Sequence, residues 1–161
     1  MTQLANLGLY GLGTMGSALA LNILDNGFAL HVANRSYDVT AEFVAEAGDL
    51  AARLTSHASL ADMARNMPAP RAIILMVPAG NPVESSIEEL CDLLEPGDTI
   101  IDAGNTDFHD TRRRTALVEG RGLTFIGWAF RAAKKVLVTV RRSWLVVRPK
   151  HGLVSAPSSK P

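Results

Sequence analysis

The sequence predicts an α/β fold with a doubly wound parallel sheet, on the strength of three observations. Short apolar runs of strand length recur through residues 6–127, most of them are followed by a run with helical spacing, and the first such junction is rich in glycine. Strand–helix–strand units of this kind make right-handed crossovers, which place helices on both faces of one sheet. Residues 1–127 are therefore expected to form one domain, whose sheet is incomplete because the pattern stops there.

The first strand–helix–strand unit is expected over residues 6–36. Residues 6–13 (NLGLYGLG) are a short apolar run that ends in glycines, which is typical of a buried strand entering a turn. Residues 14–27 have helical spacing and end in a glycine suited to a C-cap, and residues 28–36 (FALHVANRS) return to strand character. The inward face of the helix is predicted to consist of Met15, Leu19, Ile23 and Leu24.

The middle of the chain continues the alternation of helix and strand. A helix is expected over residues 38–48, a short strand over 53–56 and a further helix over 59–66. Residues 72–78 (AIILMVP) are a continuous apolar strand that a proline stops, and residues 83–97 follow as a helix. The inward face of that helix is predicted to consist of Ile87, Leu90, Cys91 and Leu94.

The last three elements are a strand, a charged helix and a strand. Residues 98–105 (DTIIDAGN) are expected to form a strand that runs into a polar loop, residues 107–120 a helix, and residues 123–127 (LTFIG) the final strand. The charged helix is predicted to turn a solvated face outward. That face consists of Arg112, Arg113 and Arg114.

Composition limits the classes of function. Hydrophobic residues make up 47% of the 161 and charged residues 20%, and the apolar runs are too short to span a bilayer, so a cytoplasmic protein without a membrane partner is expected. Cys91 is the only cysteine, which excludes disulfides and cysteine-rich metal sites. His31 is expected on a strand and His57 and His109 in loops, without the spacing of metal ligands.

The first turn carries the pattern Gly11-x-Gly13-x-x-Gly16 between a strand and a helix. Gly11 permits a tight turn, Gly13 lets the backbone approach a pyrophosphate, and Gly16 lets the helix pack closely on the strand. A bare glycine pattern also occurs in ordinary turns, but its place in the first strand–helix turn predicts a Rossmann-like dinucleotide site. The candidate pyrophosphate-binding residues are Gly11, Leu12, Gly13, Thr14, Met15 and Gly16.

The end of the second predicted strand favours NADP over NAD. An NAD site usually has an acidic residue here for the ribose 2′-hydroxyl, whereas this chain has Asn34, Arg35 and Ser36. A guanidinium can pair with a 2′-phosphate and lie over the adenine. The alternative is an ordinary surface arginine at a strand end.

Two further loops follow the later strands. Ligands collect at the carboxyl ends of the strands in an open α/β sheet, so both loops are candidates for the remainder of the site. Asn105 can offer a donor and an acceptor there, although a lone asparagine is also a common turn residue. The other candidates are Met76, Val77, Pro78 and Ala79.

With these motifs in order, the sequence resembles the 6-phosphogluconate dehydrogenases, decarboxylating enzymes of the pentose phosphate pathway and gluconate utilization. The resemblance covers about residues 5–127. It rests on GLGTMGSALALNILDNGF, NRS, LMVPAG, GDTIIDAGNTDFHDTRRR and GLTFIG, of which the segment over residues 98–114 is the most specific.

The resemblance implies a role for each candidate. It implies NADP as the cofactor, with the pyrophosphate on the glycine turn and the 2′-phosphate on Asn34, Arg35 and Ser36. It places the nicotinamide half near residues 76–79, with Asn105 between nicotinamide and substrate. Many family members have lysine where this chain has Pro78. The intact enzymes oxidise and decarboxylate 6-phosphogluconate to ribulose 5-phosphate as homodimers.

The charges of the chain divide sharply after residue 127. Residues 1–127 contain all 16 acidic residues and eight basic ones, whereas residues 128–161 contain eight basic residues and no acidic one. A basic arm for nucleic acid has this composition. However, the codons of residues 128–137 (WAFRAAKKVL), when read from the third base, permit Gly-Val-Ser-Gly-Gly-Glu-Glu-Gly-Ala. The resemblance gives that sequence as the family's own continuation.

We therefore interpret residues 128–161 as an out-of-frame, disordered and non-native basic tail. The family's substrate-binding Ser-Gly-Gly segment and the helical domain that supplies its catalytic lysine and glutamate are then missing, so no catalytic residue is expected in this truncated chain. Two alternatives stay open. One is a small binding module with a nucleic-acid-binding tail, and the other is a different 3-hydroxyacid or imine-reducing dehydrogenase-type domain, which the motif over 98–114 disfavours.

Overall fold

The strands and helices alternate as the sequence predicts. A computed structural model describes residues 6–104 and 107–127, apart from the side chain of Phe108, so the predictions for Asn105 and for the tail over 128–161 lie outside the described residues. The strands are β1 Asn6–Tyr10, β2 Leu30–Ala33, β3 Leu54–Ser56, β4 Arg71–Leu75, β5 Thr99–Asp102 and β6 Thr124–Gly127. The helices are α1 Thr14–Asp25, α2 Tyr37–Glu46, the 3₁₀ helix η1 Gly48–Arg53, α3 Leu60–Asn66, α4 Asn81–Leu93 and α5 Phe108–Gly120.

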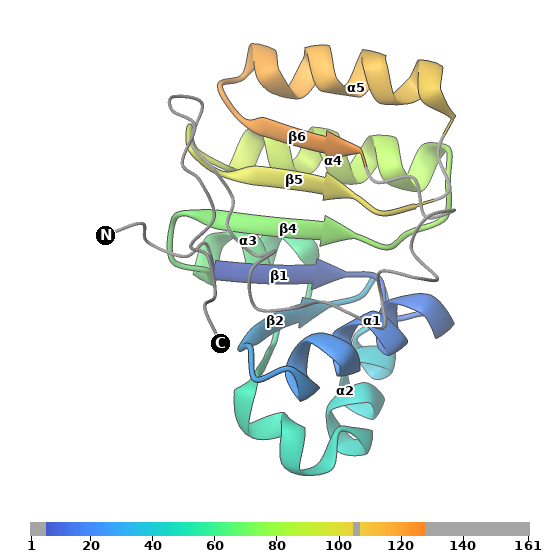
Figure 1. The fold of residues 1–161 in the computed structure, drawn as a ribbon, viewed down its shortest axis with the longest axis vertical. Coiled ribbons are helices and arrows are strands. Elements are labelled where there is room, and N and C mark those ends of the chain that lie inside the picture. Colours follow the sequence, from blue (N-terminus) through green and yellow to red (C-terminus); the bar gives the residue numbers. More distant parts are fainter. Residues whose placement is uncertain (1–5, 105–106, 128–161) are drawn as a thin grey trace, which may run out of the picture.

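All six strands run parallel in one sheet, in the order β3-β2-β1-β4-β5-β6 (Figure 1). The chain builds outward from β1 to β3, crosses back to β4 beside β1, and then builds outward to β6. This is the strand order of dinucleotide-binding folds, and its topological switch point lies between β1 and β4. The doubly wound α/β prediction is confirmed. The expectation that the sheet is incomplete concerns chain beyond residue 127 and stays a prediction.

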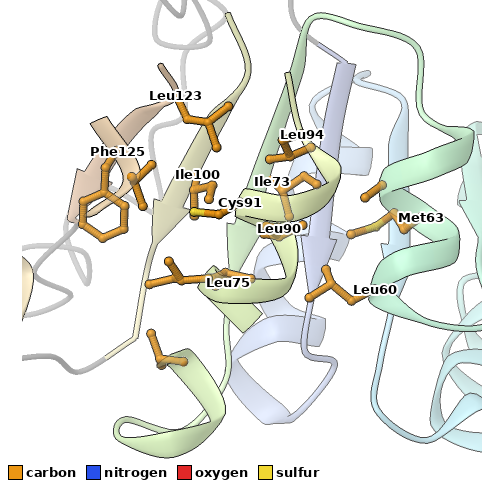
Figure 2. Close-up of a cluster of buried hydrophobic side chains, with 14 of the residues drawn as sticks. Leu60, Met63, Ile73, Leu75, Leu90, Cys91, Leu94, Ile100, Leu123 and Phe125 are labelled. Carbon is orange, nitrogen blue, oxygen red and sulfur yellow. The ribbon is translucent and has the colours of Figure 1, made fainter. Parts of the chain in front are cut away.

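The central strand β4 is buried on both faces and divides the core in two. Ile73 and Leu75 point into one apolar cluster, formed with α3, α4, β5 and β6. Ala72 and Ile74 point into the other, formed with α1, α2, β1 and β2. Figure 2 shows the first cluster, with Ile73 and Leu75 facing Leu90 of α4. A strand with both faces covered explains why its sequence is continuously apolar instead of alternating.

The inward faces of the helices agree with the prediction except at one position. Leu19, Ile23 and Leu24 of α1 are buried, but Met15 is 46% exposed. Met15 is the second residue of α1 and lies just after the glycine turn that follows β1. The prediction that Met15 belongs to the core is therefore wrong, whereas its position beside the glycine turn is unaffected.

Side-chain caps mark the starts of two helices. Ser59 Oγ accepts a hydrogen bond from Asp62 N (3.1 Å) and caps α3, and Asp107 Oδ1 accepts one from His109 N (2.9 Å) and caps α5. His109 thus lies in a helix and not in the predicted loop. The 3₁₀ helix η1 had no sequence signal.

Within the described residues, no helix combines the length and apolarity needed to cross a membrane.

Candidate functional site

The glycine turn joins β1 to α1 at the switch point of the sheet. Gly11 has φ +104°, a conformation that side chains disfavour, and a Cβ there would collide with the carbonyl oxygen of Met76. A Cβ on Gly16 would collide with the carbonyl oxygen of Gly11. A Cβ on Gly13 would meet nothing within 4 Å. Gly11 and Gly16 therefore permit close backbone contacts that a side chain would prevent, whereas the space beside Gly13 is open.

The end of β2 holds this turn in place through Asn34. The Asn34 Oδ1 atom accepts a hydrogen bond from Leu12 N (3.0 Å), and Gly11 N donates to the carbonyl oxygen of Ala33 (3.1 Å). On the helix side, Ser17 Oγ donates to the carbonyl oxygen of Leu12 (2.9 Å). The turn is thus fixed from both sides before any ligand arrives, and Asn34 already has a structural partner.

Arg35 and Ser36 lie exposed beside this turn, and Ser36 is the N-cap residue of α2. Within residues 6–104 and 107–127, no hydrogen bond or ion pair engages the Arg35 guanidinium. Tyr10, the last residue of β1, is close enough to feel this charge. Burial raises the pKa of Tyr10, the nearby Glu89 raises it further, and Arg35 opposes both effects. The end of β2 therefore presents a cation and no carboxylate.

The loop after β4 completes the described part of the site. Met76 N donates a hydrogen bond to the carbonyl oxygen of Tyr10 (2.8 Å), which ties this loop to the start of the glycine turn. Met76 and Val77 are half-buried, whereas Pro78 and Ala79 are exposed. The structure thus brings the predicted residues of three loops to the carboxyl ends of β1, β2 and β4. The binding role of each, and that of Asn105, stays a prediction.

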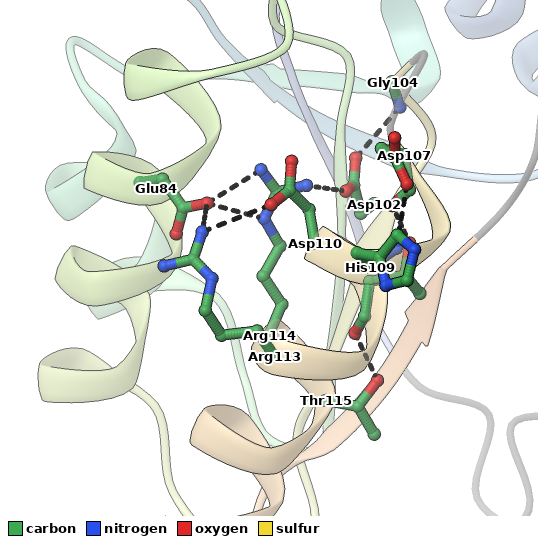
Figure 3. A network of polar contacts seen from close by, with 10 residues as sticks. Glu84, Asp102, Gly104, Asp107, His109, Asp110, Arg113, Arg114 and Thr115 are labelled. Carbon is green, nitrogen blue, oxygen red and sulfur yellow. Dashed lines mark hydrogen bonds and ion pairs between the residues drawn. The ribbon is translucent and has the colours of Figure 1, made fainter.

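A buried ion-pair network lies next to these loops (Figure 3). Arg114 of α5 is only 1% exposed. Its Nη1 donates to Asp102 Oδ2 (3.0 Å), and its Nε and Nη2 both donate to Glu84 Oε1 (3.0 and 2.8 Å). Arg113 Nη2 donates to the same Glu84 oxygen (2.6 Å) but is 65% exposed. One guanidinium therefore joins α5 to β5 and to α4.

The prediction that all three arginines form a solvated helix face is wrong for Arg114. Its position four residues before the fully buried Val118 places both on the inward face of α5. That spacing was a readable signal. Its partners were not readable, because Asp102 and Glu84 lie 12 and 30 residues away in sequence. A charged side chain is buried at this depth only when such partners exist.

A second polar cluster lies at the edge of the sheet formed by β2 and β3. His31 Nδ1 and His57 Nε2 are 2.9 Å apart, and His57 Nδ1 lies 3.6 Å from Asp62 Oδ2. Burial lowers the pKa of His31, and the neighbouring His57 lowers it further. No group of three potential metal ligands occurs among the residues that the structure describes. The cluster thus connects β2, the residue that follows β3, and α3.

Comparison with known proteins decides the family. A family model described as the NAD binding domain of 6-phosphogluconate dehydrogenase matches residues 6–130, most of the chain. The chain belongs to this family. Two of its relatives are decarboxylating 6-phosphogluconate dehydrogenases, from Chlamydia pneumoniae (43% identical over 122 residues) and Synechococcus elongatus (45% over 124). The matches cover 76% and 77% of this chain, but the chain spans only about a quarter of the length of these family members.

Solved structures agree with the family and show how widely its fold is shared. The 6-phosphogluconate dehydrogenase of Plasmodium falciparum, solved with its cofactor NADP⁺ and with 6-phosphogluconate, superposes with a TM-score of 0.70 at 28% identity. That match covers 83% of this chain and 33% of the other. An imine reductase of Myxococcus stipitatus, solved with NADP⁺, superposes at 0.64 with 18% identity over 76% of this chain and 39% of its own, which shows the fold alone.

Proposed function

We propose that residues 6–127 are the NADP-binding domain of a 6-phosphogluconate dehydrogenase. The observation that carries the proposal is the glycine turn at the switch point, closed by Gly11 and Gly16 and open at Gly13. A pyrophosphate can approach the backbone only where no side chain intervenes, and the N-terminal N–H groups of α1 lie at that position. The site therefore fits a dinucleotide, with Leu12, Thr14 and Met15 beside the phosphates.

The preference for NADP over NAD rests on the end of β2. Arg35 is an exposed cation in the position where an NAD site has a carboxylate for the ribose hydroxyls, and Ser36 adds a hydroxyl beside it. A guanidinium pairs with a phosphate dianion through charge-assisted hydrogen bonds. The nicotinamide half would then lie along Met76, Val77, Pro78 and Ala79, next to Asn105.

Titration of the chain with NADPH and NADH, followed by nicotinamide fluorescence, tests the proposal. We expect NADPH to bind more tightly than NADH, and Arg35→Gln to remove most of that difference, because a charge-assisted hydrogen bond contributes about 1.5–3 kcal/mol, or roughly 10-fold to 100-fold in affinity. Arg65→Gln, a change on α3, is the matched control and should bind as the unchanged chain does. Failure to bind either dinucleotide would overturn the proposal.

The whole reaction belongs to the intact relatives. They would oxidise and decarboxylate 6-phosphogluconate as cytoplasmic homodimers, with catalytic groups from a later helical domain. We propose that this chain has lost that part through a frameshift near Gly127, so that the tail over residues 128–161 is not native. The charge reversal at residue 128 and the end of the family match at residue 130 support this. Resequencing the gene across the codons for Gly127 and Trp128 tests it.

The competing function, a nucleic-acid-binding tail, has one supporting observation, the eight basic residues after residue 127. Duplex DNA titrated at two salt concentrations tests it, because phosphate contacts make affinity fall steeply with salt. Under the frameshift proposal we expect only weak, sequence-independent binding. Tight binding that disappears on deletion of residues 128–161 would favour the competing function.

A further inference from the structure

Arg114 of α5 is bonded to the two elements next to the candidate loops, α4 after the loop over residues 76–79 and β5 before residues 103–104. Its side chain is buried and donates three hydrogen bonds to two carboxylates on different elements. The planar fork of a guanidinium can serve two partners at once in a fixed relative orientation, which the point charge of a lysine cannot do. Arg114 therefore fixes the distance between the elements that carry its two partners.

One partner, Glu84, controls the start of α4. Glu84 lies in the first turn of that helix, and its backbone N donates a hydrogen bond to the carbonyl oxygen of Gly80 (3.2 Å). Gly80 is the N-cap residue, with φ +95°, and directly follows the loop over residues 76–79. Holding the Glu84 carboxylate thus holds the point at which this loop enters its helix.

The other partner, Asp102, controls the end of β5. Its side chain is fully buried, its Oδ2 accepts from Arg114 Nη1, and its Oδ1 accepts from Gly104 N (3.0 Å). The carboxylate therefore bends the chain through Ala103 and Gly104 as it leaves the sheet. Ala103 N in turn donates to the carbonyl oxygen of Leu75 (3.1 Å), the last residue of β4. The two loops are thus joined both through the backbone and through Arg114.

Stability alone does not call for this arrangement. A buried ion pair seldom stabilises a fold more than well-packed apolar side chains of the same volume would, because desolvation offsets the attraction. What the network provides is a fixed geometry at the edge of the sheet. That edge is the one where the proposed function places the nicotinamide half, whereas the adenine half lies on the other side of β1, at Arg35.

We propose that Arg114 is a positioning residue that aligns the loop over residues 76–79 and the chain over residues 103–104, which leaves β5, for the nicotinamide half of the dinucleotide. The proposal rests on the proposed function, since it states which part of that dinucleotide site depends on Arg114. It separates the site into an adenine half that is independent of Arg114 and a nicotinamide half that depends on it.

The test compares two probes on three forms of the chain. NADPH spans the whole site, and 2′,5′-ADP occupies the adenine half only. For Arg114→Lys we expect NADPH affinity to fall about tenfold and the fluorescence enhancement of bound nicotinamide to be lost, with 2′,5′-ADP affinity unchanged within twofold. Arg113→Lys is the matched control, because Arg113 contacts Glu84 from the surface without reaching Asp102, and it should bind both probes normally.

Two results would overturn the inference: equal weakening of both probes, which is the mark of a merely structural role, or no change in either. If circular dichroism shows that Arg114→Lys does not fold, Glu84→Gln decides instead, because it loosens one half of the fork and leaves the Asp102 pair. The same selective loss is expected there, and its absence counts against the inference. If the unchanged chain binds neither probe, it is the proposed function that fails.

Discussion

Gly13 and Gly16 lie three residues apart, yet an added methyl group would meet very different surroundings at the two positions. At Gly16 it would overlap the Gly11 carbonyl oxygen, and at Gly13 it would enter open space. The same substitution therefore separates packing from binding at the scale of a single residue.

Gly16→Ala should destabilise the domain by about 2–3 kcal/mol, as overpacking does, because α1 must move away from the turn. Gly13→Ala should cost about 1 kcal/mol or less, through a poorer N-cap, while weakening NADPH binding. Urea unfolding and NADPH titration of both variants measure the two effects. A Gly13→Ala chain that kept full affinity would contradict the position given to the pyrophosphate.

Asp98 is a second residue whose role is set by burial. It directly precedes β5, at the amino end of the strands. It is 1% exposed and accepts hydrogen bonds from Arg71 N (2.7 Å), Arg71 Nη1 (3.1 Å) and Glu95 N (2.9 Å). Asp98→Ala should destabilise the domain by about 3–5 kcal/mol, because it leaves the largely buried Arg71 guanidinium without a counterion, bonded only to the carbonyl oxygens of Met67 and Leu93. Asp92→Ala removes the exposed Asp92–Arg121 pair and should cost less than about 1 kcal/mol. Equal losses in chemical denaturation would contradict this.

At the scale of elements, β2 and β3 are joined at the sheet edge by more than backbone pairing. His31 of β2 and His57, which follows β3, stack at 5.2 Å between ring centroids, and Asp62 of α3 lies beside His57. A proton on His31 would place a positive charge in a partly buried site beside the His57 ring. The packing of this edge therefore depends on pH.

The sign of that dependence follows from the lowered pKa of His31. Below the ordinary histidine pKa of 6.5 the unfolded chain takes up a proton that the folded chain resists. The free energy of unfolding should therefore fall as the pH drops from 7 towards the lowered pKa of His31. His31→Gln should show a smaller fall over the same range. Parallel curves for the two chains in chemical denaturation would contradict the assignment.

The sequence predicts elements well where the signal is local. The apolar run over residues 72–78 identified β4, and the three glycines identified the geometry of the turn, because backbone sterics act over a few residues. The 3₁₀ helix η1 was missed because tertiary packing on α1, including the Arg53 Nη1 bond to the Leu24 carbonyl oxygen (2.6 Å), supports it. Arg114 was missed for the same reason, since its burial depends on distant carboxylates.

At the scale of the whole molecule, every residue of both apolar clusters lies between Leu7 and Phe125. The structure describes no residue beyond 127, so the boundary of the domain over residues 1–127 stays a prediction. We expect a chain shortened to these residues to unfold cooperatively, with a free energy within about 0.5 kcal/mol of the full chain, the range of changes outside a core. NADPH at 100 times its Kd should add about 2.7 kcal/mol to both. Thermal scans check this, and a shortened chain that fails to fold would refute the boundary.

The open side of Gly13 also has a consequence for how the gene changes over generations. Missense substitutions in the first two bases of a glycine codon introduce a side chain, so Gly11 and Gly16 resist drift for as long as the fold is retained. Gly13 resists drift only for as long as a ligand is retained. In a lineage that no longer uses the dinucleotide, Gly13 would vary first. The order in which these three codons vary among related strains therefore shows whether dinucleotide binding was lost before the fold was.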